Sequence, residues 1–300
     1  MEFNRIIPFL VMPLLLVIVE LGALALSLPV QAAGISAFED PTSVANPFIF
    51  IAILLVFTGF LLLLIRFGFK KIITIVIAGS IFFTFGYIFS ALVSPVFGVT
   101  DIAVLLILVL SILATLVLYW YPEWYVIDSL GILIAAGVAS IFGVSLDILP
   151  VVILLVILAV YDAISVYKTK HMITLAEGVI DLKTPILFVI PKKRNYSFIR
   201  EGIGKLGEGT ERAAFIMGMG DLIMPSILVV SANVFVKGYR VLGFINLPAI
   251  GAIIGSLAGL GVLLFFVNSG RPQAGLPPLN GGTIIGFALG LGLLKILTFL

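Results

Sequence analysis

The chain has 300 residues, 62% of them hydrophobic and only 11% charged, and its mean hydropathy is +1.31. Because soluble domains carry about 25% charged residues, this composition excludes an ordinary soluble protein and predicts a polytopic membrane protein. The lack of cysteine excludes disulfides, thiolate metal sites and cysteine nucleophiles, and the single His171 leaves no histidine-based zinc site. The net charge of +2 favours no class of partner, and we expect no nucleic-acid partner.

Hydrophobic stretches long enough to cross a bilayer recur along the whole chain. A helix needs about 20 apolar residues to span the hydrocarbon core. Pro122 lies within a cluster of Trp and Tyr typical of a membrane interface, and it separates the fourth span from the fifth. Nine spans are predicted, at about 6–28, 47–65, 72–94, 102–121, 125–146, 148–167, 213–235, 241–267 and 282–300.

These spans predict an all-α fold in a single membrane domain over residues 1–300. Six spans occupy about 6–167, a loop follows over 168–212, and three spans occupy about 213–300. No internal sequence repeat is visible, which argues against an inverted-repeat transporter.

The first span has a second interpretation. Arg5, the apolar run and the small residues of Val30-Gln31-Ala32-Ala33 resemble a signal peptide with its cleavage site. The run is longer than an ordinary signal core and contains Glu20, so we expect a retained span. Glu20 is then an intramembrane carboxyl group, which we interpret as a buried structural partner.

Lysine and arginine are distributed unequally between the two sides of the predicted topology. With the amino terminus inside, the outside loops contain only Lys237 and Arg240, and Lys295 lies near the end of the last span. The inside segments contain all other lysine and arginine residues, most of them within 168–212. The positive-inside rule therefore predicts a multi-pass protein of the cell membrane whose amino terminus and 168–212 loop are cytoplasmic.

The loop at 168–212 is the one long polar connection. Its middle part, 173–191, is moderately apolar and predicts either a short strand or an interfacial helix. Its end is rich in glycine and charge, and we predict that this end is mobile.

Two aspartates lie inside predicted spans, Asp162 in the sixth and Asp221 in the seventh. A carboxylate in hydrocarbon is costly and is a functional-site candidate by default. The sixth span ends near Lys168 and the seventh begins after Arg212, so a helical rise places the two acids about 9 and 13 Å from the inner boundary. On antiparallel neighbouring helices they could face each other.

Two carboxyl groups that meet in a low-dielectric site would share one proton. One could take a proton from water while the other polarises a peptide carbonyl, and this chemistry requires no metal, nucleophile or cofactor. Gly218 and Gly220 leave room beside Asp221 for another backbone, although glycines are also common where membrane helices pack. The alternative is a transporter or channel that binds protons or cations at the same two acids.

A peptide bond inside a membrane helix is shielded until the helix unwinds, and the freed strand then needs an edge partner. An irregular segment containing proline could supply that edge. Pro277, Pro278 and Leu279 lie immediately before the last span, on the inner side with the two acids, and we select them for substrate binding. The alternatives are an ordinary loop at this position, or Pro248, which lies inside the eighth span and is expected to kink a helix.

Three motifs together resemble the presenilin and signal peptide peptidase family, in particular a microbial (archaeal-type) presenilin homologue. They are Tyr161-Asp162, Gly218-Met219-Gly220-Asp221 and Leu276-Pro277-Pro278-Leu279 before the last of nine spans. The resemblance implies an intramembrane aspartyl protease of the GxGD type that cuts the transmembrane helices of other proteins. It implies that Asp162 and Asp221 are the catalytic pair, with Tyr161 in a supporting role.

The third motif departs from the family pattern, which is Pro-Ala-Leu. Pro278 replaces the alanine and removes an amide donor. Pro248-Ala249-Ile250 matches the first two residues of the family motif but lies in the wrong span. The predicted orientation is the presenilin-like one. Because the loop is short compared with that of presenilins in gamma-secretase, we expect activity without accessory subunits.

The resemblance implies that the partners are the lipid bilayer and transmembrane-helix substrates; a homo-oligomer is left open. Asp128, near the aromatic cluster of the fifth span, is interpreted as facing the lipid headgroups. Asp128 and Glu20 sit in no motif and are left out of the catalytic set.

Overall fold

Long helices dominate the molecule. The computed structural model describes residues 3–169, 187–193, 195–202, 214–241, 243–267 and 273–299. In chain order the elements are α1 (Phe3–Ala32), α2 (Ala45–Arg66), α3 (Lys70–Phe97), α4 (Asp101–Trp120), α5 (Trp124–Ser145), α6 (Ile148–Ile164), the π-helical turn η1 (Ser165–Thr169), β1 (Leu187–Pro191), α8 (Phe198–Glu201), β2 (Ala214–Gly218), α9 (Met219–Phe235), β3 (Arg240–Val241), β4 (Ile245–Asn246), α10 (Leu247–Val267) and α11 (Leu276–Phe299).

The predicted all-α membrane fold is confirmed. Among the described residues, eight helices are long and apolar enough to cross a membrane, and α9 is a shorter apolar helix. As predicted, the chain breaks around Pro122, since α4 ends at Trp120 and α5 begins at Trp124.

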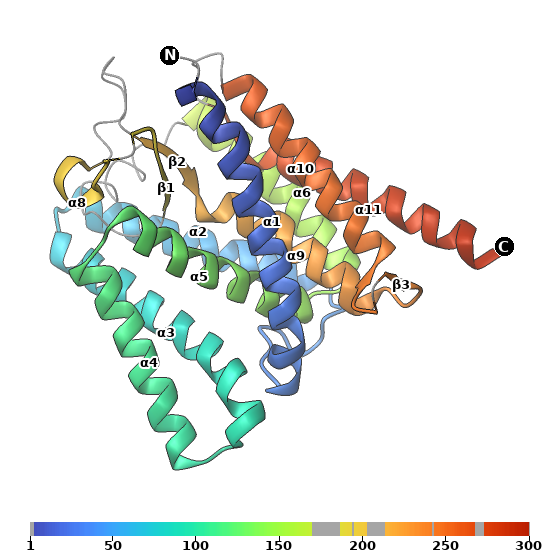
Figure 1. Cartoon of the computed structure of the whole chain (residues 1–300), viewed down its shortest axis with the longest axis horizontal. Coiled ribbons are helices and arrows are strands. Elements are labelled where there is room, and N and C mark those ends of the chain that lie inside the picture. The colour runs from blue at the N-terminus through green and yellow to red at the C-terminus, as the bar shows by residue number, and fades with distance from the viewer. Residues whose placement is uncertain are drawn as a thin grey trace.

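The helices that carry the candidate residues pack into one bundle. In this bundle α1 packs on α5 and α9, α9 also packs on α6, and α11 packs on α10 and α6. Figure 1 shows that α3 and α4 form a helical hairpin that extends away from the bundle. The interior of α9 is buried from Pro225 to Asn233, so this helix forms the centre of the core.

Glycine brings α10 and α11 into close contact along their length. A Cβ atom on any glycine of this seam would overlap the backbone of the opposite helix. Small residues at four-residue spacing permit such an approach between membrane helices. The glycines of the seam are Gly251, Gly255 and Gly259 on α10, and Gly282, Gly286 and Gly290 on α11.

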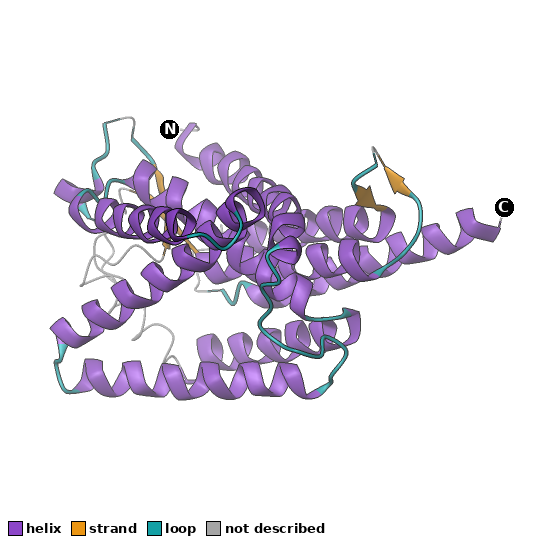
Figure 2. Ribbon diagram, turned by 90° about the horizontal axis from the view of Figure 1, so that it is seen from below, coloured by secondary structure: helices purple, strands orange, loops and turns teal. Residues whose placement is uncertain are grey.

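Two short hairpins lie on different sides of the bundle (Figure 2). Antiparallel β1 and β2 pair from Leu187 opposite Gly218 to Pro191 opposite Ala214, and β3 pairs with β4. Strand β1 confirms the strand alternative for the end of the apolar loop segment. Residues 173–186 of that segment, and the glycine-rich part at 203–213 that was predicted to be mobile, lie outside the described residues.

Three predicted span starts are wrong. Residues 214–218 form β2 rather than helix, because they pair with β1. The eighth span begins at Leu247 rather than at 241, so Pro248 is the second residue of α10. It does not kink the helix, since the first amides of a helix have no intrahelical acceptor and proline is tolerated there. For the same reason Pro277 and Pro278 fit the first turn of α11, which begins at Leu276 rather than at 282.

Candidate active site

Asp162 lies in the last turn of α6, where the helix changes character. The chain passes directly into the π-helical turn η1, and the Ser165 hydroxyl donates to the carbonyl oxygen of Asp162 over 2.9 Å. Such wide turns often accompany functional sites. The Asp162 side chain is buried, with 7% of its surface exposed.

Asp221 lies in the first turn of α9, directly after strand β2. Gly218 is extended and precedes the helix as its N-cap, and a Cβ atom there would lie 3.4 Å from Asp221 Oδ2. Gly220 is exposed, with open space where a side chain would be. The stretch between Arg212 and Asp221 therefore contains a strand, and the depth that we derived from a helical rise does not apply to it.

A short segment before α11 contacts both acids. The Leu276 amide donates to Asp162 Oδ2 over 3.0 Å. A Cβ atom on the preceding Gly275 would lie 3.1 Å from the carboxyl carbon and both carboxyl oxygens of Asp221. Consecutive residues thus touch Asp162 and Asp221, so the structure brings together the two acids that the sequence singled out.

Tyr167, in the turn η1, attaches this segment to the end of α6. Its hydroxyl donates to Gln273 Oε1 over 2.8 Å and accepts the Ala274 amide over 3.2 Å. Sequence reasoning missed both Tyr167 and Gly275 and selected Tyr161, which is partly buried. The only sequence signal for Gly275 is its position directly before the Leu276 motif.

The expected irregular backbone at Pro277–Leu279 is wrong, because these residues form the first turn of α11. Leu279 is fully buried, and a Cβ atom on Gly259 would overlap the Pro278 carbonyl. The residue whose backbone reaches an acid is Leu276. The missing amide of Pro278 costs the helix nothing, since it falls among the first amides that have no intrahelical acceptor.

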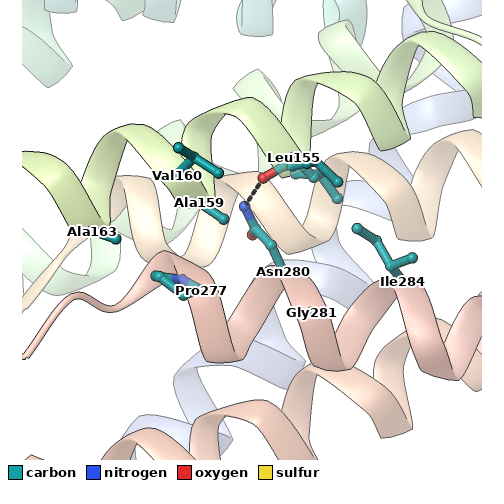
Figure 3. A pocket seen from close by; sticks show the side chains of 9 residues that line it. Leu155, Ala159, Val160, Ala163, Pro277, Asn280, Gly281 and Ile284 are labelled. Atoms are coloured by element: carbon teal, nitrogen blue, oxygen red, sulfur yellow. Dashed lines mark hydrogen bonds between the residues drawn. The ribbon is translucent and has the colours of Figure 1, made fainter.

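An apolar groove of about 270 Å³ runs between α6 and α11 (Figure 3). Val156 and Val160 are exposed at its rim, and it is also lined by Pro277, which directly follows the Leu276 whose amide binds Asp162. At its floor Asn280 Nδ2 donates to the Leu155 carbonyl over 2.9 Å. The groove is lined by Leu155, Val156, Ala159, Val160, Ala163, Pro277, Asn280, Gly281 and Ile284.

The two other intramembrane acids have separate surroundings. Glu20 is fully buried in α1 and its Oε1 lies 2.6 Å from the Ser256 hydroxyl of α10, which confirms its interpretation as a buried structural partner. Asp128 does not simply face headgroups, because its Oδ1 accepts the Val189 amide over 2.9 Å. Within the part of the chain that the structure describes, no group of three or more potential metal ligands comes together.

Comparisons with known proteins identify the family of the chain. The family model described as signal-peptide peptidase, presenilin aspartyl protease matches residues 13–296. A solved structure of a presenilin family intramembrane aspartate protease in space group P2 is 51% identical, covers 95% of this chain and 98% of its own, and has a TM-score of 0.70. A second, in space group C222, is 49% identical, covers 96% and 98%, and has a TM-score of 0.68.

No curated protein matches the chain. Neither the family nor the solved structures support the alternative of a transporter or channel. The family match covers nearly the whole chain, and the solved relatives are about half identical to it. The chain therefore belongs to the presenilin and signal peptide peptidase family and is an intramembrane aspartyl protease.

Proposed function

We propose that Asp162 and Asp221 are the catalytic pair of a GxGD-type endopeptidase that hydrolyses peptide bonds within transmembrane helices. One observation carries the proposal: the consecutive residues Gly275 and Leu276 together contact both acids, since both hydrogen-bond through their backbone to Asp162 and Gly275 also packs against the Asp221 carboxyl group. An aspartyl protease needs two carboxyl groups close enough to act on one peptide bond and one water molecule. Burial away from bulk water strengthens every electrostatic interaction between these groups.

The surroundings of the two acids suggest how they divide the work. The hydrogen bond from the Leu276 amide suits a negative charge on Asp162. No hydrogen bond among the described residues reaches the Asp221 carboxyl group, so we assign the one shared proton to Asp221. The family chemistry then needs no group beyond the pair and a water.

The reaction proceeds in two proton-balanced steps. Asp162 takes a proton from water as the water oxygen bonds to the peptide carbonyl carbon, and Asp221 gives its proton to the carbonyl oxygen. The resulting diol then collapses. The carbon–nitrogen bond breaks, Asp162 gives its proton to the leaving amine, and Asp221 regains a proton from a diol hydroxyl. The pair ends in the protonation state in which it began.

We assign substrate binding to the elements that converge on the pair. Strand β2 leads directly to Asp221 through Gly218, and the exposed Gly220 leaves space beside that acid. Pro277 lines the groove between α6 and α11 and directly follows Leu276, which binds Asp162. Pro278 and Leu279 act by holding the start of α11 against its neighbours, since Leu279 is fully buried.

A peptide mimic with a tetrahedral hydroxyl in place of the scissile carbonyl is expected to inhibit the enzyme. The hydroxyl occupies the position of the diol, so it gains interactions that the ground state lacks, and binding should improve by about 10²-fold or more. The measurement is the inhibition constant of the purified chain in lipid, cutting a single-span substrate. The matched control is the same compound without the hydroxyl. Equal inhibition by the two compounds would contradict a diol held between Asp162 and Asp221.

We further propose that the amino terminus and the 168–212 loop are cytoplasmic, in a cell membrane, and that one chain acts without accessory subunits. We also propose that the spans and the loop belong to one membrane domain. The unequal distribution of lysine and arginine supports the orientation. The shortness of the loop supports independence from partners.

Single cysteines test this orientation cleanly, because the chain has none of its own. Ser36, between α1 and α2, and Lys193, after β1, are both exposed. A membrane-impermeant maleimide added to intact cells is expected to label S36C but not K193C, and to label both after the cells are opened. Labelling of K193C but not of S36C in intact cells would show that the topology is the inverse of the one proposed.

A further inference from the structure

Asp128 connects α5 to the hairpin that leads into the candidate active site. Its Oδ1 accepts the backbone amide of Val189, in the middle of β1, over 2.9 Å. Val189 is 1% exposed, so its amide has no access to water and depends on this acceptor. Asp128 thus supplies a hydrogen bond that a neighbouring strand would otherwise provide.

The direction of the Val189 amide determines which edge of the hairpin is open. In an antiparallel pair, residues alternate between those whose amide and carbonyl face the partner strand and those whose groups face outward. Val189 is paired with Ile216 and donates to Asp128, so both residues of this pair face outward. The outer edge of β1 is therefore covered by α5. Among the described residues no further strand pairs with the outer edge of β2, toward which the Ile216 amide and carbonyl point, so this is the edge that remains for another strand.

A second contact positions the hairpin against α5 next to Asp221. A Cβ atom on Gly131, one turn after Asp128, would lie 3.2 Å from the Phe188 ring and 2.9 Å from the methyl carbon of Met219. Phe188 belongs to β1, and Met219 is the first residue of α9, two residues before Asp221. The same face of α5 therefore sets the position of β1 and of the turn that carries one acid.

The segment beyond β1 is attached to the start of the same helix. Glu123, at the N-cap of α5, accepts the Ser197 hydroxyl over 2.6 Å and the Phe198 amide over 3.0 Å. Two carboxylates of one helix thus hold β1 and the residues that follow it.

We propose that Asp128 is a positioning residue of the protease. Because Asp128 closes the outer edge of β1, an unwound substrate strand lies along the outer edge of β2, which ends beside Asp221. Asp128 also fixes the register of that substrate strand. The inference rests on the proposed function. Asp128 acts through β1 and β2.

The test compares two substitutions at Asp128 with a control on the same helix. D128A removes the acceptor, whereas D128N keeps an oxygen that can accept the Val189 amide. The control is S140A, because the Ser140 hydroxyl is buried in α5 without a hydrogen-bond partner in the described residues. For each purified variant, kcat, KM, the cleavage positions in a single-span substrate and the rate of hydrogen exchange at the Val189 amide are measured.

D128A is expected to raise KM about tenfold, the size of one lost hydrogen bond, with a smaller change in kcat. Its cleavage positions should spread in steps of two residues, because a strand keeps the same face toward the site only when it shifts by two. Exchange at Val189 should become faster. D128N and S140A should resemble the wild type, and a general loss of stability would not move the cleavage positions in this way.

The outcomes separate this inference from the proposed function. A wild type that cuts no transmembrane substrate overturns the proposed function, and with it the role in substrate register. An active wild type, combined with unchanged cleavage positions, KM and Val189 exchange in D128A, overturns the positioning role alone. D128N as impaired as D128A would overturn the assignment of a hydrogen-bond acceptor.

Discussion

Replacing either Asp162 or Asp221 with asparagine is expected to abolish proteolysis while the fold remains intact. An amide has nearly the same shape as a carboxyl group but cannot take up or deliver a proton, so each variant should lose about 10³-fold or more in rate. In Asp162→Asn the amide oxygen can still accept the Leu276 amide, so the link between α6 and the start of α11 is kept. Loss of activity then reports chemistry rather than unfolding.

The measurement is product formed from a single-span substrate by purified variants in lipid, together with their thermal unfolding. Glu20→Gln is the matched control, because Glu20 is another fully buried intramembrane acid whose oxygen contacts Ser256 and whose amide form keeps that acceptor. This variant should cut at the wild-type rate. If cleavage survives in either Asp→Asn variant, the assignment of that acid as catalytic is wrong.

The spans and the two acids could be predicted because each gives a strong local signal. Hydropathy over about 20 residues identifies a span without knowledge of its neighbours. A carboxyl group within such a span is costly wherever the helix packs, so Asp162 and Asp221 stood out before any contact was known. Pro122 was informative because it lies within an aromatic cluster typical of the membrane interface, where a proline favours a break between two helices.

The parts that sequence reasoning missed depend on partners far away in the chain. Residues 214–218 are apolar enough for a span and become a strand only because β1 pairs with them. The partner of Asp128 is Val189, 61 residues away, so nothing near Asp128 indicated its contact. Gly275 matters only because Asp221 packs against it, and a single glycine gives no signal of that contact.

The backbone of the proline motif was misjudged. Proline was read as a sign of irregular structure near the acids, whereas Pro277 and Pro278 occupy a helix start, where proline is favoured. In our proposal, the strand edge near the acids is instead that of β2, which pairs with β1. This change moves the expected site of substrate pairing from the third motif to the residues that directly precede Asp221.

Replacing Gly255 with valine is expected to separate α10 from α11 and to inactivate the enzyme without touching either acid. A Cβ atom at this position would overlap the Gly282 carbonyl and approach the Gly286 Cα to 2.9 Å. Because the obstacle is backbone, no side-chain rotation relieves it, and the helices must move apart. Overpacking of this kind is expected to cost about 3 kcal/mol of stability.

The same seam controls the geometry of the acids. It continues to Gly259, whose missing Cβ makes room for the Pro278 carbonyl, and Pro278 lies two residues after the amide that holds Asp162. A displacement of α11 should therefore break the Leu276 contact, so that activity falls further than the loss of folded protein explains. Gly261→Val is the matched control, since Gly261 lies on the same helix, is exposed and has nothing within 4 Å of its Cβ position. The measurements are thermal unfolding and substrate cleavage, compared between the two valine variants. Equal behaviour of the two variants would show that the close approach of α10 and α11 does not hold the start of α11 against Asp162.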